Sequence, residues 1–299
     1  MNRERILLVG DNPFHGVSHL SQDRARNRSQ EISNFEYGAN LVRLSLENGA
    51  DGFMFSISDN TLGILRILTR NRKTPKLYAI APAASDYVRL ASRLGTPGMV
   101  IHLAKQILIS GNYKAIADSL KGIVRRDLVS LMKAYLFYEV YRIKSATTKT
   151  ANLHCFMLHE IVTDMALTLN LNWLFSSYID FMLSLRIKPG FETRNFPYLI
   201  DKFMKWGIEL DKITLVAPFN KIGFQMSPSQ TNCEAALTNI PETEVIAMSV
   251  LASGYLKPYE AISYINSLPQ INGLVIGISK EKHATDFKIF KDTLGINKG

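Results

Sequence analysis

Several side chains that can exchange protons near neutral pH follow short apolar segments of the sequence. Histidine titrates closest to physiological pH, and a nearby carboxylate can share general acid–base work with it. Residues of these types, placed directly after buried segments, are typical of sites where a substrate is protonated and deprotonated. The catalytic candidates are Asp11, Asn12, His15, His19, Asp59 and His159.

The histidines among these candidates could also bind a divalent metal, because imidazole and carboxylate groups are common metal ligands. The metal-ligand candidates are His15, His19 and His159. His15 and His19 lie in a loop that contains Pro13 and Gly16, not on a helix that would place both on one face. Their spacing therefore indicates no particular metal, and acid–base catalysis with or without a metal stays open.

A second set of residues has the chemistry of an anion site. The long segment after Gly16 contains Arg24 and Arg26, whose planar guanidinium groups match carboxylate and phosphate oxygens. Near the end of the chain, small and hydroxyl-bearing residues let the backbone approach a ligand closely. These residues are Ser253, Gly254, Gly277 and Ser279, and the cationic Lys280 follows the last of them. Together, the two groups predict a small anionic substrate.

The elements that must position these residues alternate between short apolar runs and amphipathic stretches. Runs without polar alternation are typical of strands buried on both faces of a parallel sheet. Helical spacing of apolar residues lies between them, at 34–48, 62–69, 198–206 and 260–268. The nine predicted strands are Ile6–Gly10, Gly52–Ser56, Lys76–Pro82, Met99–Ala104, Leu153–Leu158, Tyr178–Leu183, Ile213–Ala217, Val245–Val250 and Leu274–Ile278.

This alternation predicts a (β/α)8 (TIM) barrel that forms one domain over residues 1–299. A doubly wound sheet is the alternative, but its Gly-x-Gly-x-x-Gly fingerprint is absent after the first strand. A barrel needs eight strands, so one of the nine is superfluous, and Tyr178–Leu183 is the weakest. Because loops after parallel strands share one end of a barrel, we expect His15, His19 and His159 to converge on one cavity.

A helical insertion at about 105–150 interrupts the alternation. Its apolar stripe runs from Ile116 to Tyr138, and residues 101–150 hold nine Lys and Arg against three Asp and Glu. Such a stripe must be covered, either by the outer helices of the barrel or by a second subunit in a homodimer. The basic side of the insertion attracts anions, and nucleic acid is one partner of that kind.

The composition is that of a globular, basic protein, with 46% hydrophobic and 20% charged residues and a net charge of +9. Two cysteines, Cys155 and Cys233, are too few for a disulfide framework or a Cys-based zinc site. No apolar stretch approaches the roughly 18–20 residues that span a bilayer. We therefore expect a cytoplasmic protein with no membrane partner.

Two parts of the sequence resemble known barrel families. The block from Val245 to His283, with its Ser253-Gly254 and Ile278-Ser279 turns, resembles the end of aldo/keto reductases. In that family this region holds the phosphates of NADPH, so the resemblance implies NADP as cofactor. Thr193-Arg-Asn-Phe196 is similar to the family's Ser-Asn-Phe turn.

The first half of the sequence departs from that family. The catalytic Tyr of the reductases would stand five positions after Asp59, where this sequence has Ile64, and no Lys ends the third predicted strand. The opening Gly10-Asp-Asn-Pro-Phe-His-Gly-Val-Ser-His19 resembles an uncharacterised TIM-barrel family that begins Gly-Gly-Asn-Pro-Phe-Ser-Gly-x-Ser-His. That resemblance implies the same fold and carries no known activity with it.

Three functional hypotheses follow. The first is a barrel enzyme that performs acid–base chemistry, with or without a metal, on a small anionic metabolite. The second is an NADP-dependent oxidoreductase similar to the aldo/keto reductases. The third is a non-enzymatic barrel that binds nucleic acid or a protein partner through the basic insertion.

The predicted anion site has a direct test. Phosphate or sulfate should stabilise the protein through Ser253, Gly254, Ser279 and Lys280, by about 2.7 kcal/mol at 100 times the dissociation constant. Thermal unfolding across a phosphate series measures this shift. Ser279→Pro should abolish the shift; a shift that Ser279→Pro leaves unchanged would place the anion site elsewhere.

Overall fold

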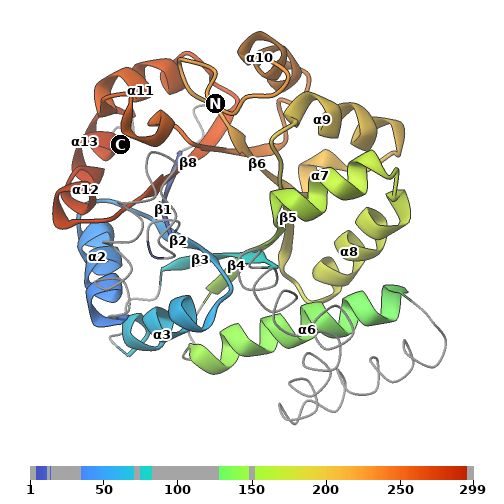
Figure 1. Ribbon diagram of the computed structural model, residues 1–299, viewed down its shortest axis with the longest axis horizontal. Coiled ribbons are helices and arrows are strands. Elements are labelled where there is room, and N and C mark those ends of the chain that lie inside the picture. The colour runs from blue at the N-terminus through green and yellow to red at the C-terminus, as the bar shows by residue number, and fades with distance from the viewer. Residues whose placement is uncertain are drawn as a thin grey trace, which may run out of the picture.

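The computed structural model describes residues 5–11, 14, 35–70, 75–82, 128–147 and 152–294. Eight parallel strands pair in chain order, and the last pairs with the first, so the sheet closes into a barrel. Figure 1 looks along this barrel, with the helices outside the ring of strands. The predicted (β/α)8 barrel is thus confirmed. The strands are β1 (Ile6–Gly10), β2 (Gly52–Ser56), β3 (Lys76–Ala81), β4 (Asn152–Leu158), β5 (Lys188–Glu192), β6 (Thr214–Pro218), β7 (Glu244–Met248) and β8 (Ile271–Gly277).

The helices follow the strands and cover their outer side. Four of them, α2, α3, α9 and α11, correspond to the four helical patterns that the sequence predicts. None of the described helices is long and apolar enough to cross a membrane. The α-helices are α2 (Phe35–Glu47), α3 (Asp59–Leu68), α6 (Leu128–Ala146), α7 (Glu160–Thr168), α8 (Asn172–Ser184), α9 (Phe196–Lys205), α10 (Gln230–Thr238), α11 (Pro258–Asn266), α12 (Glu281–Thr285) and α13 (Phe287–Thr293).

The barrel has two separate apolar cores. A large core lies between the strands and the helices, and a smaller one fills the barrel interior. The interior core is formed by Leu8, Met54, Tyr78, Ile80, Cys155, Met157, Val216 and Ile246. The middle of the barrel is therefore filled by side chains and is not a pore.

Two strand predictions need correction. Tyr178–Leu183 belongs to α8, and Tyr178 lies buried with its hydroxyl donating to the carbonyl oxygen of Phe156. The fifth strand is instead Lys188–Glu192, whose sequence Lys-Pro-Gly-Phe-Glu contains no apolar run. The predicted strand Met99–Ala104 lies outside the described residues. The barrel is complete without it, because β3 pairs directly with β4.

Helix α6 is the described part of the predicted insertion, of which residues 105–127 and 148–150 lie outside the described residues. It runs beside α3 and α8 (Figure 1). Its buried face includes Leu136, Val140 and Ile143, which join the outer core. Of the predicted stripe, Tyr138 is buried, and Leu131 and Tyr135 are half-buried. The stripe is thus partly covered within the described residues, and the homodimer stays a prediction.

An ion-pair bridge ties α6 to α3. The guanidinium of Arg142 on α6 donates to Glu139 and to Asp59, each at 2.9 Å. Glu139 is buried, whereas the Asp59 side chain at the start of α3 is 99% exposed. The two carboxylates that Arg142 contacts therefore differ strongly in solvent exposure.

This difference predicts unequal effects of two substitutions. Arg142→Met should lower the free energy of unfolding by about 1–3 kcal/mol, because Glu139 loses a charge-assisted hydrogen bond in a buried setting. Asp59→Asn should produce no measurable change, since exposed ion pairs contribute little. Urea unfolding of both variants provides the measurement. Equal effects would show that burial of Glu139 does not govern the bridge.

Candidate active site at the mouth of the barrel

The C-terminal ends of the strands form one rim of the barrel, here called the mouth. Phe191 of β5 packs outward, in the core between strands and helices. A Cβ placed on Gly190 would lie 2.5 Å from Cγ of Met157 and 2.8 Å from Sγ of Cys155, so Gly190 faces the interior. Because side chains alternate along a strand, Glu192 also points into the barrel, at its mouth.

Glu192 is 7% exposed and lies among charged groups. The backbone N–H of Glu160 donates a hydrogen bond to its carboxylate, and the charges of Glu160, Asp11 and Arg194 act on it. Burial raises the pKa of Glu192 to about 8, helped by the negative charges of Glu160 and Asp11 and opposed by Arg194. At neutral pH Glu192 therefore carries a proton.

Asp11 follows β1 and is 2% exposed. Its Oδ2 accepts a hydrogen bond of 2.6 Å from the backbone N–H of Ser56 at the end of β2. Its carbonyl oxygen accepts one of 2.7 Å from the N–H of Phe14. These contacts hold the start of the first loop against the neighbouring strand and keep the carboxylate at the mouth.

His159 joins the end of β4 to α7. Its backbone N–H donates to the carbonyl of Ala81 at 2.9 Å, and its Nδ1 caps α7 by accepting from the N–H of Ile161 at 3.2 Å. Burial lowers the pKa of His159, against the opposing effect of Glu160. The imidazole is thus held neutral, and because Nδ1 accepts a hydrogen bond, Nε2 carries the proton.

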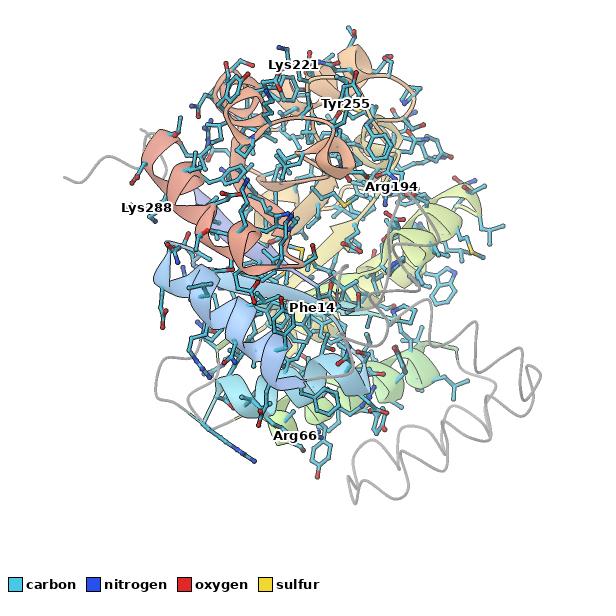
Figure 2. All side chains as sticks on the ribbon, turned by 60° about the vertical axis from the view of Figure 1, so that its left-hand side comes forward. Phe14, Arg66, Arg194, Lys221, Tyr255 and Lys288 are labelled. Atoms are coloured by element: carbon cyan, nitrogen blue, oxygen red, sulfur yellow. The ribbon has the colours of Figure 1, made fainter. Side chains whose placement is uncertain are left out.

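Arg194, which is labelled in Figure 2, joins α7 to the loop after β6. Its Nε donates to Glu160 and its Nη1 to the side-chain oxygen of Gln225. Its backbone N–H donates to Oδ2 of Asp164 at 3.1 Å. No described residue accepts a hydrogen bond from the remaining nitrogen, Nη2.

Asp164, on α7, receives a second hydrogen bond of 2.5 Å from the hydroxyl of Thr193. Burial raises the pKa of Asp164, while the hydrogen bonds from Thr193 and Arg194 act in the opposite direction. The carboxylate thereby fastens the residues after β5 to α7. We refer to Asp11, His159, Glu160, Glu192 and Arg194, which these contacts hold, as the mouth cluster.

The mouth cluster combines a protonated acid with a neutral imidazole at the same pH. Glu192 can give a proton to a substrate, and the Nε2–H of His159 can donate a hydrogen bond to an oxygen that gains negative charge. Environments that push the pKa values of neighbouring groups in opposite directions are typical of acid–base sites.

The structure brings together some of the predicted catalytic residues and not others. Asp11 and His159 both belong to the mouth cluster. Asp59 does not, because its exposed carboxylate pairs with Arg142. The other predicted residues, namely Asn12, His15, His19, Arg24 and Arg26, lie outside the described residues, so the convergence of the three histidines stays a prediction.

The predicted anion-binding residues follow β7 and β8. Ser253 and Gly254 lie in a short turn and have φ values of 60° and 90°, in the left-handed region. Gly277, at the exposed end of β8, pairs with Gly10 of β1. The hydroxyl of Ser279 lies 3.2 Å from Nδ1 of His283, and Lys280 directly precedes α12. These residues thus lie on other strands than Glu192 and His159.

Sequence patterns missed Glu192, Glu160 and Arg194. Glu192 is not among the predicted residues because β5 shows no apolar run, although Lys188, Gly190 and Glu192 alternate with Pro189 and Phe191. That alternation, placed between two helical patterns, is the signal that would have located Glu192. Arg194 lies in the turn that resembles the reductases, but that resemblance assigns no role to its side chain. Glu160 adjoins a predicted residue, His159, and only the fold shows that its backbone contacts Glu192.

Among the described residues, no three His, Cys, Asp or Glu side chains are arranged to hold a metal ion. A metal bound by His159 with His15 and His19 stays a prediction, since the last two lie outside the described ranges.

The same fold occurs in aldo-keto reductases of known structure. A Pseudomonas aeruginosa protein assigned to that class aligns with a TM-score of 0.56 at 10% identity, over 96% of this chain and 90% of that chain. An aldo-keto reductase from Bacillus halodurans gives 0.54 at 9% identity, over 88% and 83%. One from Klebsiella pneumoniae, in complex with NADPH, gives 0.50 at 9%, over 98% and 90%.

At these identities the similarity shows the shared (β/α)8 fold. No family model matches the chain, and no curated protein sequence matches it. The function must therefore be inferred from the residues at the mouth.

The raised pKa of Glu192 predicts how stability depends on pH. A glutamate in the unfolded chain loses its proton near pH 4.5, whereas folded Glu192 keeps it up to about pH 8. Between these values the folded state binds more protons, so the free energy of unfolding falls as pH rises, by at most about 1.4 kcal/mol per pH unit. Glu192→Gln, which stays neutral, should remove this dependence in denaturant unfolding over a pH series.

The exposed residue Glu209, which pairs with Lys212, offers a matched control. Glu209→Gln should keep the wild-type pH dependence. If Glu192→Gln also kept it, Glu192 would not be protonated in the folded protein at neutral pH.

Proposed function

We propose that this protein is a TIM-barrel enzyme that performs acid–base chemistry at the mouth of the barrel on a small anionic metabolite. The observation that carries the proposal is the buried carboxyl of Glu192, which is protonated at neutral pH and shares its surroundings with the neutral imidazole of His159. Such a pair supplies a proton donor and a hydrogen-bond donor to the same substrate.

Each residue of the mouth cluster has a role in this proposal. Glu192 is the general acid, and the Nε2–H of His159 stabilises the substrate oxygen on which negative charge develops. Asp11 and Glu160 are the candidates for the base that receives a proton from the substrate. Arg194 holds Glu160 in place through its Nε.

Charge distribution suggests how an anionic substrate would lie. Carboxylates dominate the mouth cluster, so they would repel an anionic group placed beside them. Ser253, Ser279 and Lys280 follow β7 and β8, where hydroxyl and ammonium groups are available, and are better suited to that group. The carboxylate next to them in the sequence is that of Glu281, which begins α12. The reacting part of the substrate would then lie toward β4 and β5.

The second candidate function is NADP-dependent oxidoreduction. It is favoured by the shared fold of the reductases, one of which is in complex with NADPH, together with the sequence resemblance near the last two strands. The positions of the reductase Tyr and Lys correspond here to buried Ile64 on α3 and to Ala81 at the end of β3. Glu192 would therefore have to replace them as proton donor.

Two further expectations keep the status of hypotheses. Binding of nucleic acid or a protein partner would involve the basic insertion, most of which lies outside the described residues. A divalent metal would involve His15 and His19, for which the same holds. A cytoplasmic location agrees with the proposed metabolic role.

Activity measurements on metabolite mixtures test the main proposal. The wild-type protein should deplete a metabolite and form a product, and Glu192→Gln should slow this conversion by about 100-fold or more, because general acid catalysis contributes about that much. His159→Asn, which retains a side chain able to cap α7, should also slow it.

Asp201→Asn, the same kind of change as Glu192→Gln made on the exposed face of α9, is the control and should keep full activity. Full activity of Glu192→Gln would refute the assigned role of Glu192.

Titration with NADPH separates the two candidate functions. Saturable quenching of protein fluorescence, with hydride transfer to a carbonyl substrate, would support the oxidoreductase. Native mass spectrometry first establishes that the purified protein carries no nicotinamide cofactor. If this protein then converts the metabolite at the same rate without added cofactor, the result supports the acid–base enzyme alone.

A further inference from the structure

Gln225 makes an unusual pair of contacts in the loop between β6 and α10. Its side-chain oxygen accepts hydrogen bonds from Nη1 of Arg194 and from the hydroxyl of Ser249, the latter at 3.0 Å. Arginine can only donate, so the atom that faces it must be the oxygen of the amide. Gln225 therefore connects the ends of β5 and β7 through one atom.

The loop that carries Gln225 is internally fixed. The side chain of Asn220, which is fully buried, donates to the carbonyl of Phe224 and accepts from its N–H, both at 2.8 Å. Beyond Gln225, the N–H of Ser227 donates to the carbonyl of Arg194 at 3.2 Å. The loop thus holds Arg194 through its backbone as well as through its side chain.

Gln225 and Ser249 share an uncommon backbone conformation. Their φ values are 62° and 55°, in the left-handed region that is unfavourable for a residue with a side chain. Two such residues from different loops bond to each other by their side chains. Strain of this kind persists where the surrounding structure requires a particular placement, which here is that of the Gln225 oxygen.

The consequence falls on Arg194. Its guanidinium is planar, and two of its nitrogens are fixed by Glu160 and Gln225, which belong to different elements. A planar group held at two points has one orientation. Without Gln225, the side chain would keep only the contact at Nε and could rotate about it.

We propose that Gln225, held by Ser249, is a positioning residue that fixes the orientation of the Arg194 guanidinium within the mouth cluster. The positive charge of Arg194 then opposes proton binding at Glu192 from a fixed position. The consequence for catalysis rests on the proposed function, whereas the effect on Glu192 does not.

The charged groups that act on Glu192 come from three elements. They are Glu160 on α7, Asp11 after β1 and Arg194 after β5. His159 and Asp164 belong to the same neighbourhood, because both act electrostatically with Glu160 and Arg194. Arg194 is the cation of this set and opposes proton binding at Glu192. If the Arg194 side chain becomes mobile, the negative charges of Glu160 and Asp11 are less well balanced, and Glu192 binds its proton more tightly.

The test measures the titration of Glu192 directly. In protein labelled with ¹³C at glutamate carboxyls, the Glu192 signal is assigned by its absence from Glu192→Gln. Gln225→Met has nearly the same length and accepts no strong hydrogen bond. We expect it to raise the proton affinity of Glu192 by about 3- to 10-fold and to remove the protection of the Arg194 Nη1 hydrogens against solvent exchange, because Nη1 is the nitrogen that Gln225 binds.

Gln230→Met is the matched control, since Gln230 bonds to Glu234 on α10, away from the mouth cluster. It should leave both signals as in the wild type. If Gln225→Met fails to fold, Ser249→Ala removes one of the two hydrogen bonds of the Gln225 oxygen and should shift the titration in the same direction by a smaller factor. Wild-type titration together with a protected Arg194 signal, in whichever of these variants folds, would overturn the proposal.

This experiment requires no substrate. A shifted titration with full activity of Glu192→Gln would retain the positioning role and refute the proposed acid. An unshifted titration with loss of activity in Glu192→Gln would refute the positioning role of Gln225 and support the proposed acid.

Discussion

The ladder of hydrogen bonds between β1 and β8 is the constraint on which the rest of this structure depends. Five consecutive residue pairs, from Ile6 with Gly273 to Gly10 with Gly277, join the first strand to the last and close the barrel. Closure creates an interior that every second side chain must enter, and apolar side chains occupy its middle. Polar groups at the mouth, such as Glu192, are therefore shielded from water on the side that faces this interior core.

That shielding explains the chemistry proposed for the mouth. For Glu192, the loss of hydration outweighs the hydrogen bond from Glu160 and the charge of Arg194, so the neutral acid is the stable form. The same loss of hydration keeps His159 neutral. A single physical cause thus yields a protonated acid and an uncharged imidazole in one cluster, where both are influenced by Glu160, Asp11 and Arg194.

The similarity to aldo-keto reductases concerns the fold. In this chain the residue five positions after Asp59 is the buried Ile64, and the third strand ends in Ala81. One barrel supports many chemistries because its loops change while its strands persist. An acid on β5 is therefore compatible with the shared fold.

The sequence by itself determined the barrel, because most of its strands are continuous apolar runs that only a sheet buried on both faces explains. It also located Asp11 and His159, since each directly follows such a run. It could not locate β5, because a strand whose inward residues are Lys188, Gly190 and Glu192 shows no apolar run. Nor could the sequence show that Asp59 lies outside the mouth cluster, because Asp59 and His159 both follow strands. In the folded protein the exposed Asp59 carboxylate pairs with Arg142 on α6. Tertiary structure alone decided which charges surround Glu192, because its neighbours come from loops far apart in the chain that the closed barrel brings to one rim.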